Sequence, residues 1–409
     1  MTGINQKALH DIRVVDLSRV LAGPYCGQLL ADFGADVIKV EAPGGDENRV
    51  WPPIVPSVTR SGMPSQTSAN FNSVNRGKRS LVLDLKTPAA REVLQQLVRQ
   101  SDVLLHSFLP DTAARLGISN DALRAANKRL VVATISGFGA HGELAERRGY
   151  DMMAQAFAGM MSVTGQPGGP PIRCGASIVD MATGISLYGG IVTALLQRVE
   201  TGEGTWVHGS LLETAVSLMG HFAVGWMQAG VLPQPQGSGS SVIAPYQAFK
   251  CQDGMILAGA PNDGAWARFC DALECPELAK DPRFQGNMAR VERLDTLIPL
   301  LAPRFAAKPM AYWLERLESR NVACAPIHTL DQVMTHPQVL ANAMRIQVKD
   351  TAGQASDVLG TPFKLADGGG TATTAAPTLG ADTDVLMRTW LGMDDTGIAA
   401  LRSAGAFGA

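Results

Sequence analysis

The sequence has few charged residues and no strong excess of either sign. Charged side chains make up 18% of its 409 residues, against roughly 25% in typical soluble domains, and the formal net charge is −2. It contains no run of five or more lysines and arginines, which argues against a nucleic-acid partner. Because 46% of the residues are hydrophobic, we expect a large buried interior divided between two domains.

The sequence also lacks segments typical of membrane targeting. No uninterrupted apolar run approaches the roughly 18–20 residues that span a bilayer, and the first residues lack the apolar region of a signal peptide. The six cysteines are scattered without a CxxC pair, which is typical of thiols in a reducing compartment. We therefore expect a cytoplasmic protein with no membrane partner.

Several common catalytic signatures are missing too. The turn after the first predicted strand reads RVLAGPYCG, so the GxGxxG motif of dinucleotide binding is absent. There is also no GxxxxGK[ST] phosphate-binding loop, no HExxH metal motif and no GxSxG nucleophile turn. The sequence thus favours neither NAD(P), ATP, metal nor serine-hydrolase chemistry, and we expect no metal ion and no prosthetic group.

Strands and helices alternate through the first half of the chain. Apolar, β-branched segments at 12–18, 36–41, 80–86, 102–108 and 130–139 predict strands, with helical spacing between them. This alternation predicts an α/β fold with a parallel, Rossmann-like sheet.

Proline and glycine mark the end of this first domain. After the segment VLPQPQGSGSS at 231–241, a hairpin and the helices 263–274 and 310–320 predict a smaller α+β domain. We expect a large domain over 1–229, a small domain over 230–330 and a C-terminal segment over 331–409.

One carboxylate stands among small and apolar residues in the segment ASIVDMATG, residues 176–184. Asp180 precedes a helix expected to begin near Met181, so it could be the N-cap that accepts the free backbone amides. It could also be a nucleophile that the helix N-terminus keeps ionised, and the two roles are compatible. The residues alone leave both interpretations open.

Several motifs, in the same order along the chain, resemble those of the class III CoA-transferases, the CaiB/BaiF or formyl-CoA transferase family. The resemblance covers nearly the whole chain, and its motifs include DLSRVLAGPYCGQLLADFGADVIKVEAPGGDENR (16–49), NRGKRSLVLDLKTP (75–88), RRGYDMMAQAFAGMMSVTG (147–165) and PIRCGASIVDMATG (171–184). It implies a homodimer of two interlocked subunits, in which the C-terminal segment returns to the large domain. It also implies that acyl-CoA and a small carboxylic acid are the substrates.

The resemblance assigns the nucleophile to Asp180, which would form an acyl anhydride and then an aspartyl-CoA thioester. The expected CoA contacts are Arg19, Val20, Leu21, Ala22, Lys78, Ser107, Phe108, Arg115, Leu116 and Tyr150. Arginine and lysine side chains would meet the CoA phosphates, and the small residues would accept adenine or pantetheine.

Two alternatives remain open beside transfer. Racemases of 2-methylacyl-CoA share this fold, but they have a histidine where this chain has Tyr150, and two-base proton exchange needs a base on each face of the α-carbon. Because tyrosine is a weak base at neutral pH, Tyr150 favours transfer. A non-catalytic acyl-CoA-binding relative is the other alternative.

The acceptor acid is suggested by the segment 240–263 together with 171–184. Both are most similar to succinyl-CoA:glutarate (dicarboxylate) CoA-transferases, so the expected donor is succinyl-CoA. A second carboxylate on the acceptor would need a cation, for which Arg148, Arg173 and Lys250 are candidates. The loop 237–241 reads GSGSS rather than a run of glycines, and its role is open.

Overall fold

The computed structural model describes residues 7–58, 64–350, 353–366, 370 and 374–408. The chain divides into two compact units. Unit 1 comprises residues 1–159, 174–223 and 337–409, and unit 2 comprises 160–173 and 224–336. The expected small domain, 230–330, omitted the segment 160–173. This segment belongs to unit 2 because it is tied to the glycine- and serine-rich loop, where the Gly237 amide donates to the Gly165 carbonyl at 2.7 Å.

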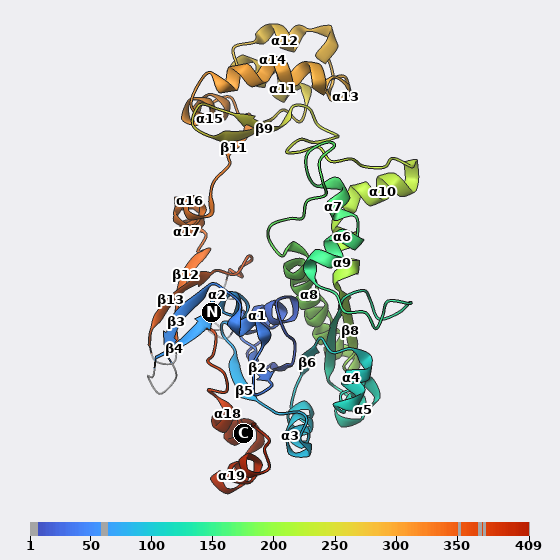
Figure 1. Ribbon diagram of the computed structural model, residues 1–409, viewed down its shortest axis with the longest axis vertical. Coiled ribbons are helices and arrows are strands. Elements are labelled where there is room, and N and C mark those ends of the chain that lie inside the picture. The colour runs from blue at the N-terminus through green and yellow to red at the C-terminus, as the bar shows by residue number, and fades with distance from the viewer. Residues whose placement is uncertain (1–6, 59–63, 351–352, 367–369, 371–373, 409) are drawn as a thin grey trace. The chain divides into compact units, whose positions relative to one another are not determined.

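Unit 1 is built on a six-stranded parallel sheet, which confirms the expected α/β class (Figure 1). The strand order is β5-β2-β1-β6-β7-β8, so the sheet grows outward in both directions from β1 and β6. This is the doubly wound order of Rossmann folds. The strands are β1 (Arg13–Asp16), β2 (Asp36–Glu41), β5 (Arg79–Val82), β6 (Val103–His106), β7 (Val131–Ser136) and β8 (Trp206–Ser210).

Helices α1 (Ala22–Asp32) and α8 (Ile178–Thr201) pack closely against each other. Gly184 makes this possible, because a Cβ atom there would lie 2.7 Å from the carbonyl oxygen of Ala22. Within the described residues, α8 is the one helix long and apolar enough to cross a membrane by length and composition. One side of α8 is buried against α1 and β8, as in a core helix of a folded domain.

The main core of unit 1 lies on another set of helices and includes the C-terminal segment. Leu94 and Leu97 of α3 (Pro88–Arg99) meet Leu386 and Trp390 of α18 (Thr383–Leu391) in one apolar cluster. The Trp390 indole also donates to Asp36 at 2.9 Å. The other elements of unit 1 are η1 (Glu47–Val50), β3 (Ile54–Val58), β4 (Pro64–Ser68), α2 (Ala69–Asn75), α4 (Pro110–Arg115), α5 (Asn120–Ala126), α6 (Asp151–Phe157), α9 (Leu211–Leu218), α17 (Pro337–Ala341), β12 (Arg345–Lys349), β13 (Ala355–Leu359) and α19 (Asp395–Ser403).

Unit 2 has its own aromatic core. Strands β9 (Tyr246–Lys250), β10 (Met255–Gly259) and β11 (Ala323–Pro326) form an antiparallel sheet, and helices cover it (Figure 1). The rings of Phe249 and Phe305 stack with centroids 4.3 Å apart. The helices are α7 (Met160–Val163), α11 (Asp263–Ala272), α12 (Pro276–Lys280), η2 (Pro282–Phe284), α13 (Asn287–Glu292), α14 (Leu294–Ala306), α15 (Met310–Glu318) and α16 (Leu330–Thr335); α10 (Gly220–Ala229) spans the boundary between the units.

Candidate active site

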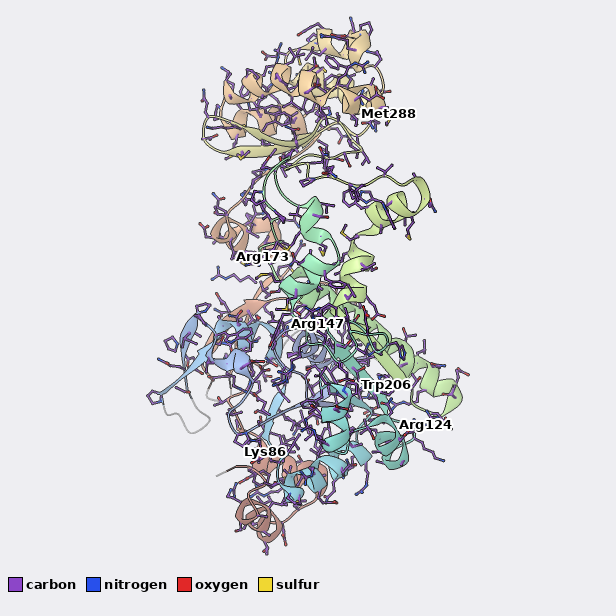
Figure 2. The ribbon with its side chains drawn as sticks, turned by 45° about the vertical axis from the view of Figure 1, so that its right-hand side comes forward. Lys86, Arg124, Arg147, Arg173, Trp206 and Met288 are labelled. Carbon is purple, nitrogen blue, oxygen red and sulfur yellow. The ribbon has the colours of Figure 1, made fainter. Side chains whose placement is uncertain are left out.

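A large cavity in unit 1 lies at the carboxyl ends of β1 and β6, where the strand order reverses. Its volume is about 1170 Å³. Ligands of open α/β sheets bind at this switch point, because the loops on either side diverge there. Arg147 and Trp206, both labelled in Figure 2, belong to the cavity wall.

Most of the site residues predicted from the sequence line this cavity. They are Arg19, Val20, Leu21, Ala22, Ser107, Phe108, Tyr150 and Asp180. They come from the β1–α1 turn, the β6–α4 connection, the residue before α6 and the first turn of α8. Segments far apart in the sequence therefore meet around one cavity.

Asp180 is the third residue of α8, not its N-cap. The helix begins at Ile178, and the N-cap residue Ser177 makes no side-chain capping bond. The expected helix start near Met181 is therefore wrong by about one turn. Asp180 has 9% of its surface exposed and lines the cavity. Within the described residues, its carboxylate accepts no hydrogen bond.

The cap of α8 is supplied by a different residue, Asp151, the first residue of α6. Its Oδ2 accepts the backbone amides of Val179 at 2.8 Å and of Asp180 at 3.1 Å. Its Oδ1 accepts from Nε2 of Gln155 at 2.6 Å, and Oε1 of Gln155 accepts the amide of Cys174 at 2.9 Å. One buried carboxylate thus ties α6, α8 and the segment before α8 together.

The position of Asp151 changes the electrostatics of Asp180. Burial, and then the negative charge of Asp151, raise the pKa of Asp180 to about 7. Both effects oppose the ionisation that a helix N-terminus would favour. Asp151 already occupies the amides that would have stabilised the Asp180 anion, and a second negative charge disfavours ionisation.

The turn between β1 and α1 has an uncommon backbone conformation. Val20 has φ 70°, a region that β-branched residues rarely enter. Its amide lies 3.3 Å from both carboxylate oxygens of Asp46, and its carbonyl accepts from Nδ2 of Asn48 at 2.8 Å. These two side chains hold the wall of the cavity that includes Arg19 and Leu21.

Buried charges lie beneath this turn. The Lys39 ammonium pairs with Asp46 at 2.9 Å and donates to the carbonyl of Ser18 at 3.0 Å. Asp16 pairs with Lys78 at 2.8 Å. Although burial favours a neutral carboxyl, Lys78 and Lys39 hold the pKa of Asp16 below its usual value. The two pairs connect the turn to the middle of the sheet.

Lys78, which the sequence predicted to contact a CoA phosphate, is buried outside the cavity. It does not line the cavity, and 3% of its surface is exposed. Its ammonium donates to Asp16, to the carbonyl of Pro24 at 2.7 Å and to Asn75 at 2.9 Å. Burial lowers the pKa of Lys78 to about 8. In this structure Lys78 supports the turn from inside the domain.

Arg115 and Leu116 also lie outside the cavity lining. Arg115, at the end of α4, donates to the hydroxyl of Thr112 at 3.2 Å, and Thr112 does line the cavity. Leu116 packs against the main core of unit 1. Both residues therefore support the α4 wall in this structure.

A polar layer on strands β6, β7 and β8 was not found from the sequence. Thr134 is paired in register with His106 on one side and with His208 on the other, and all three line the cavity. The Thr134 hydroxyl lies 2.8 Å from Nδ1 of His208. Burial, and then the nearby His208, lower the pKa of His106 to about 4. The even spacing of His208 from Trp206 along its strand was the signal that these two side chains share a face.

The three candidate cations for a carboxylate of the acceptor belong to different units of the chain. Arg148 lines the cavity that contains Asp180. Arg173 and Lys250 belong to unit 2. The loop 237–241 is also part of unit 2, where the Ser238 hydroxyl accepts the amide of Ala248 at 3.1 Å. Within the described residues, no group of three or more His, Cys, Asp or Glu side chains is arranged to hold a metal ion.

Comparison with known proteins agrees with the motifs and the fold. The sequence profile of CoA-transferase family III matches residues 9–383. The chain belongs to CoA-transferase family III. An acyl-CoA transferase from Fusarium pseudograminearum is 38% identical to this family III chain over 98% of the chain and 88% of the relative. The human succinyl-CoA:glutarate CoA-transferase is 33% identical over 98% of the chain and 90% of its own length.

A solved structure supports the same assignment. A CaiB/BaiF family protein from Brucella suis superposes with a TM-score of 0.84 at 34% identity. The match covers 94% of this family III chain and 100% of the solved one. The parallel sheet of unit 1 is therefore the sheet of the CaiB/BaiF fold.

Proposed function

We propose that this family III CoA-transferase moves CoA from succinyl-CoA to a dicarboxylate such as glutarate, with Asp180 as covalent nucleophile. The observation that carries the proposal is the carboxylate of Asp180. It lines a cavity of about 1170 Å³ and accepts no hydrogen bond within the described residues. A carboxylate in that state is available to attack an acyl group.

The first half of the proposed cycle loads CoA onto the enzyme. An oxygen of Asp180 attacks the thioester carbon of succinyl-CoA, the C–S bond breaks, and CoA leaves as thiolate. The thiolate then attacks the aspartyl carbonyl of the mixed anhydride, which releases succinate and leaves an aspartyl-CoA thioester.

The second half transfers CoA to the acceptor. A carboxylate of glutarate attacks the aspartyl thioester and displaces CoA thiolate, giving a second anhydride. The thiolate attacks the glutaryl carbonyl, and Asp180 is regenerated as carboxylate. Over the whole cycle one acyl-CoA thioester is broken and another of similar energy is formed, so the reaction needs no ATP, and no proposed step uses a metal or a prosthetic group.

The cavity residues suggest how the substrates are held. Arg19, Val20, Leu21 and Ala22 on the β1–α1 turn, with Ser107 and Phe108, would contact CoA, and Tyr150 would lie near the acyl group. Arg148 is our candidate for the distal carboxylate of the acceptor, because it lines the same cavity as Asp180. A guanidinium is well suited to bind a carboxylate through two parallel hydrogen bonds.

The 2-methylacyl-CoA racemase alternative is less well supported. It needs a second base opposite Asp180. Both oxygens of Asp151 already accept hydrogen bonds, and a tyrosine occupies position 150. We therefore retain transfer as the proposed reaction.

We further propose that the enzyme is a cytoplasmic homodimer of the interlocked type. Support comes from the exposed apolar side chains on α8 and α9, among them Leu196, Val199 and Val216, with 70%, 76% and 47% of their surfaces exposed. A second copy of the chain would remove this apolar surface from water. Buried thiols such as Cys26, Cys251 and Cys270 are suited to a reducing compartment.

The test is an incubation with succinyl-CoA and a panel of acids in deuterated water. We expect glutaryl-CoA to form without ATP and without deuterium at the α-carbon, and Asp180→Ala to lower the rate by a factor of about 1000 or more. Deuterium incorporation without CoA exchange would establish a racemase. Full exchange by Asp180→Ala would show that the nucleophile is another residue.

A further inference from the structure

Asp151 and Asp180 compete for the same backbone amides. A carboxylate at the third position of a helix often folds back to accept amides at the helix start. In α8, however, Asp151 reaches across from α6 and accepts the amides of Val179 and Asp180. Asp180 is left without these donors, although it lies in the turn that carries them.

Asp151 is itself held firmly in place. It is 8% exposed, and Gln155 fixes its second oxygen from one turn further along α6. Gln155 in turn accepts the amide of Cys174, so the chain just before α8 is fastened to the same point. Movement of Asp151 would therefore shift the first turn of α8 and the nucleophile on it.

We propose that Asp151 is a positioning residue that takes the amides of α8, leaves the Asp180 carboxylate to the substrate, and places a negative charge beside it. This inference rests on the proposed role of Asp180 as nucleophile. Asp151 does not touch the reacting atoms. It acts through the helix end and through its charge.

The charge of Asp151 matters because the acylation step neutralises Asp180. When the Asp180 oxygen bonds to the acyl carbon and the C–S bond breaks, the negative charge moves to the CoA sulfur. Repulsion between the two aspartates is present before this step and is relieved after it. A carboxylate with a raised pKa is also the stronger nucleophile, provided that it is ionised.

Other titratable groups lie on the elements that pack against α8. They are Tyr25, Cys26 and Asp32 on α1, His208 on β8, Glu213 on α9 and Tyr150 before α6, together with Arg19, Arg147, Arg148, His141, Asp111, Asp121 and Glu47 around the cavity. Beside burial, the charge of Asp151 raises the pKa of Asp180. The experiment can therefore be directed at a single pair.

The test is a carboxyl-carbon NMR titration of the full-length enzyme labelled with ¹³C at aspartate, without substrate. The Asp180 signal is assigned by its loss in Asp180→Asn. We expect a midpoint near pH 7 in the wild type, set by burial and Asp151. In Asp151→Asn we expect the midpoint to fall by about one pH unit or more, and the pH–rate profile of CoA transfer to move with it.

The matched control is Gln155→Ala, which removes the hydrogen bonds that hold Asp151 and Cys174 in place and retains the negative charge of Asp151. Its titration midpoint should stay near that of the wild type, while its transfer rate falls by about tenfold because the helix end is less well positioned. A wild-type midpoint in the ordinary range of aspartate would overturn the inference, whether or not Asp151→Asn folds. So would an unchanged midpoint in a folded Asp151→Asn.

The titration also separates this inference from the proposed function. It needs no substrate and no turnover. A midpoint that moves as expected supports the role of Asp151 even if the enzyme transfers no CoA, and absence of transfer then contradicts only the proposed reaction.

Discussion

At the scale of single residues, the site depends on how two aspartates share one helix end. Asp151 accepts the free amides, and Asp180 remains available inside the cavity. The arrangement disfavours the ionised form of Asp180, since burial and a like charge both raise its pKa. The ionised form of Asp180, which the proposed reaction needs, therefore lowers the free energy of unfolding.

This cost gives a prediction for Asp180→Asn. The pKa of Asp180 is higher in the folded protein than its ordinary value of 3.8, so the folded state keeps the proton to a higher pH. Stability should therefore fall as pH rises from about 4 through about 7. The asparagine variant has no such loss, and its advantage over the wild type should widen by about 2 kcal/mol between pH 5 and pH 8.

Urea unfolding at the two pH values measures this difference. Asp111→Asn is the control, because Asp111 also lines the cavity but is exposed. Its stability relative to the wild type should change little between the two pH values. An equal response of the two variants would contradict the raised pKa of Asp180.

The sequence predicted Asp180 but not its partner. ASIVDMATG is a local signal, and the family motif assigns its carboxylate. The role of Asp151 depends on amides that lie 28 and 29 residues further along the chain. Asp151 stands next to Tyr150 in the sequence, and its contact with the start of α8 is formed only in the folded domain.

At the scale of elements, the β1–α1 turn is held by charges that are buried below it. Val20 adopts a positive φ, which costs of order 1–3 kcal/mol, and Asp46 and Asn48 maintain it. Lys39 and Lys78 pair with Asp46 and Asp16 at the base of the turn. The strained turn at the switch point is thus fixed by side chains of its own domain.

Two substitutions distinguish a residue that stabilises the turn from a residue that contacts the acyl-CoA. Lys78→Met leaves the buried Asp16 carboxylate without its ion-pair partner and should cost about 3–5 kcal/mol of stability. Arg19→Ala removes an exposed side chain from the cavity wall, so stability should change by less than about 0.5 kcal/mol while KM for the acyl-CoA rises.

Unfolding midpoints and KM values for both variants check this prediction. A Lys78→Met enzyme of normal stability with a raised KM would show that Lys78 meets a CoA phosphate directly. The motif NRGKRS suggested that role. The burial of Lys78 could not be read from the sequence, because the carboxylate that pairs with it lies 62 residues earlier.

The alternation of elements was easier to predict. Apolar, β-branched runs in the strands and helical spacing between them predicted the parallel sheet, since both patterns are local. The helix start at Ile178 was missed because a cap from a distant residue leaves no local mark. The predicted boundaries left the segment 160–173 in the large domain, whereas it groups with unit 2, because its contact with the loop near Gly237 is not local.

At the scale of the whole molecule, unit 1 leaves much apolar surface on α8 and α9 uncovered. If a second copy of the chain covers it, Leu196→Glu places a charge in the interface and should shift sedimentation from dimer toward monomer. The control is Glu92→Lys on α3, a change at an exposed position outside this apolar surface. Unchanged dimers of Leu196→Glu would contradict this interface.

The most direct test of the covalent mechanism is mass spectrometry of the peptide that contains Asp180. The enzyme is mixed with succinyl-CoA, quenched with hydroxylamine and digested. We expect a hydroxamate on Asp180 that depends on succinyl-CoA and is absent from Asp151 of the same sample. An unmodified Asp180 in an enzyme that turns over under these conditions would contradict the proposal that this carboxylate carries CoA.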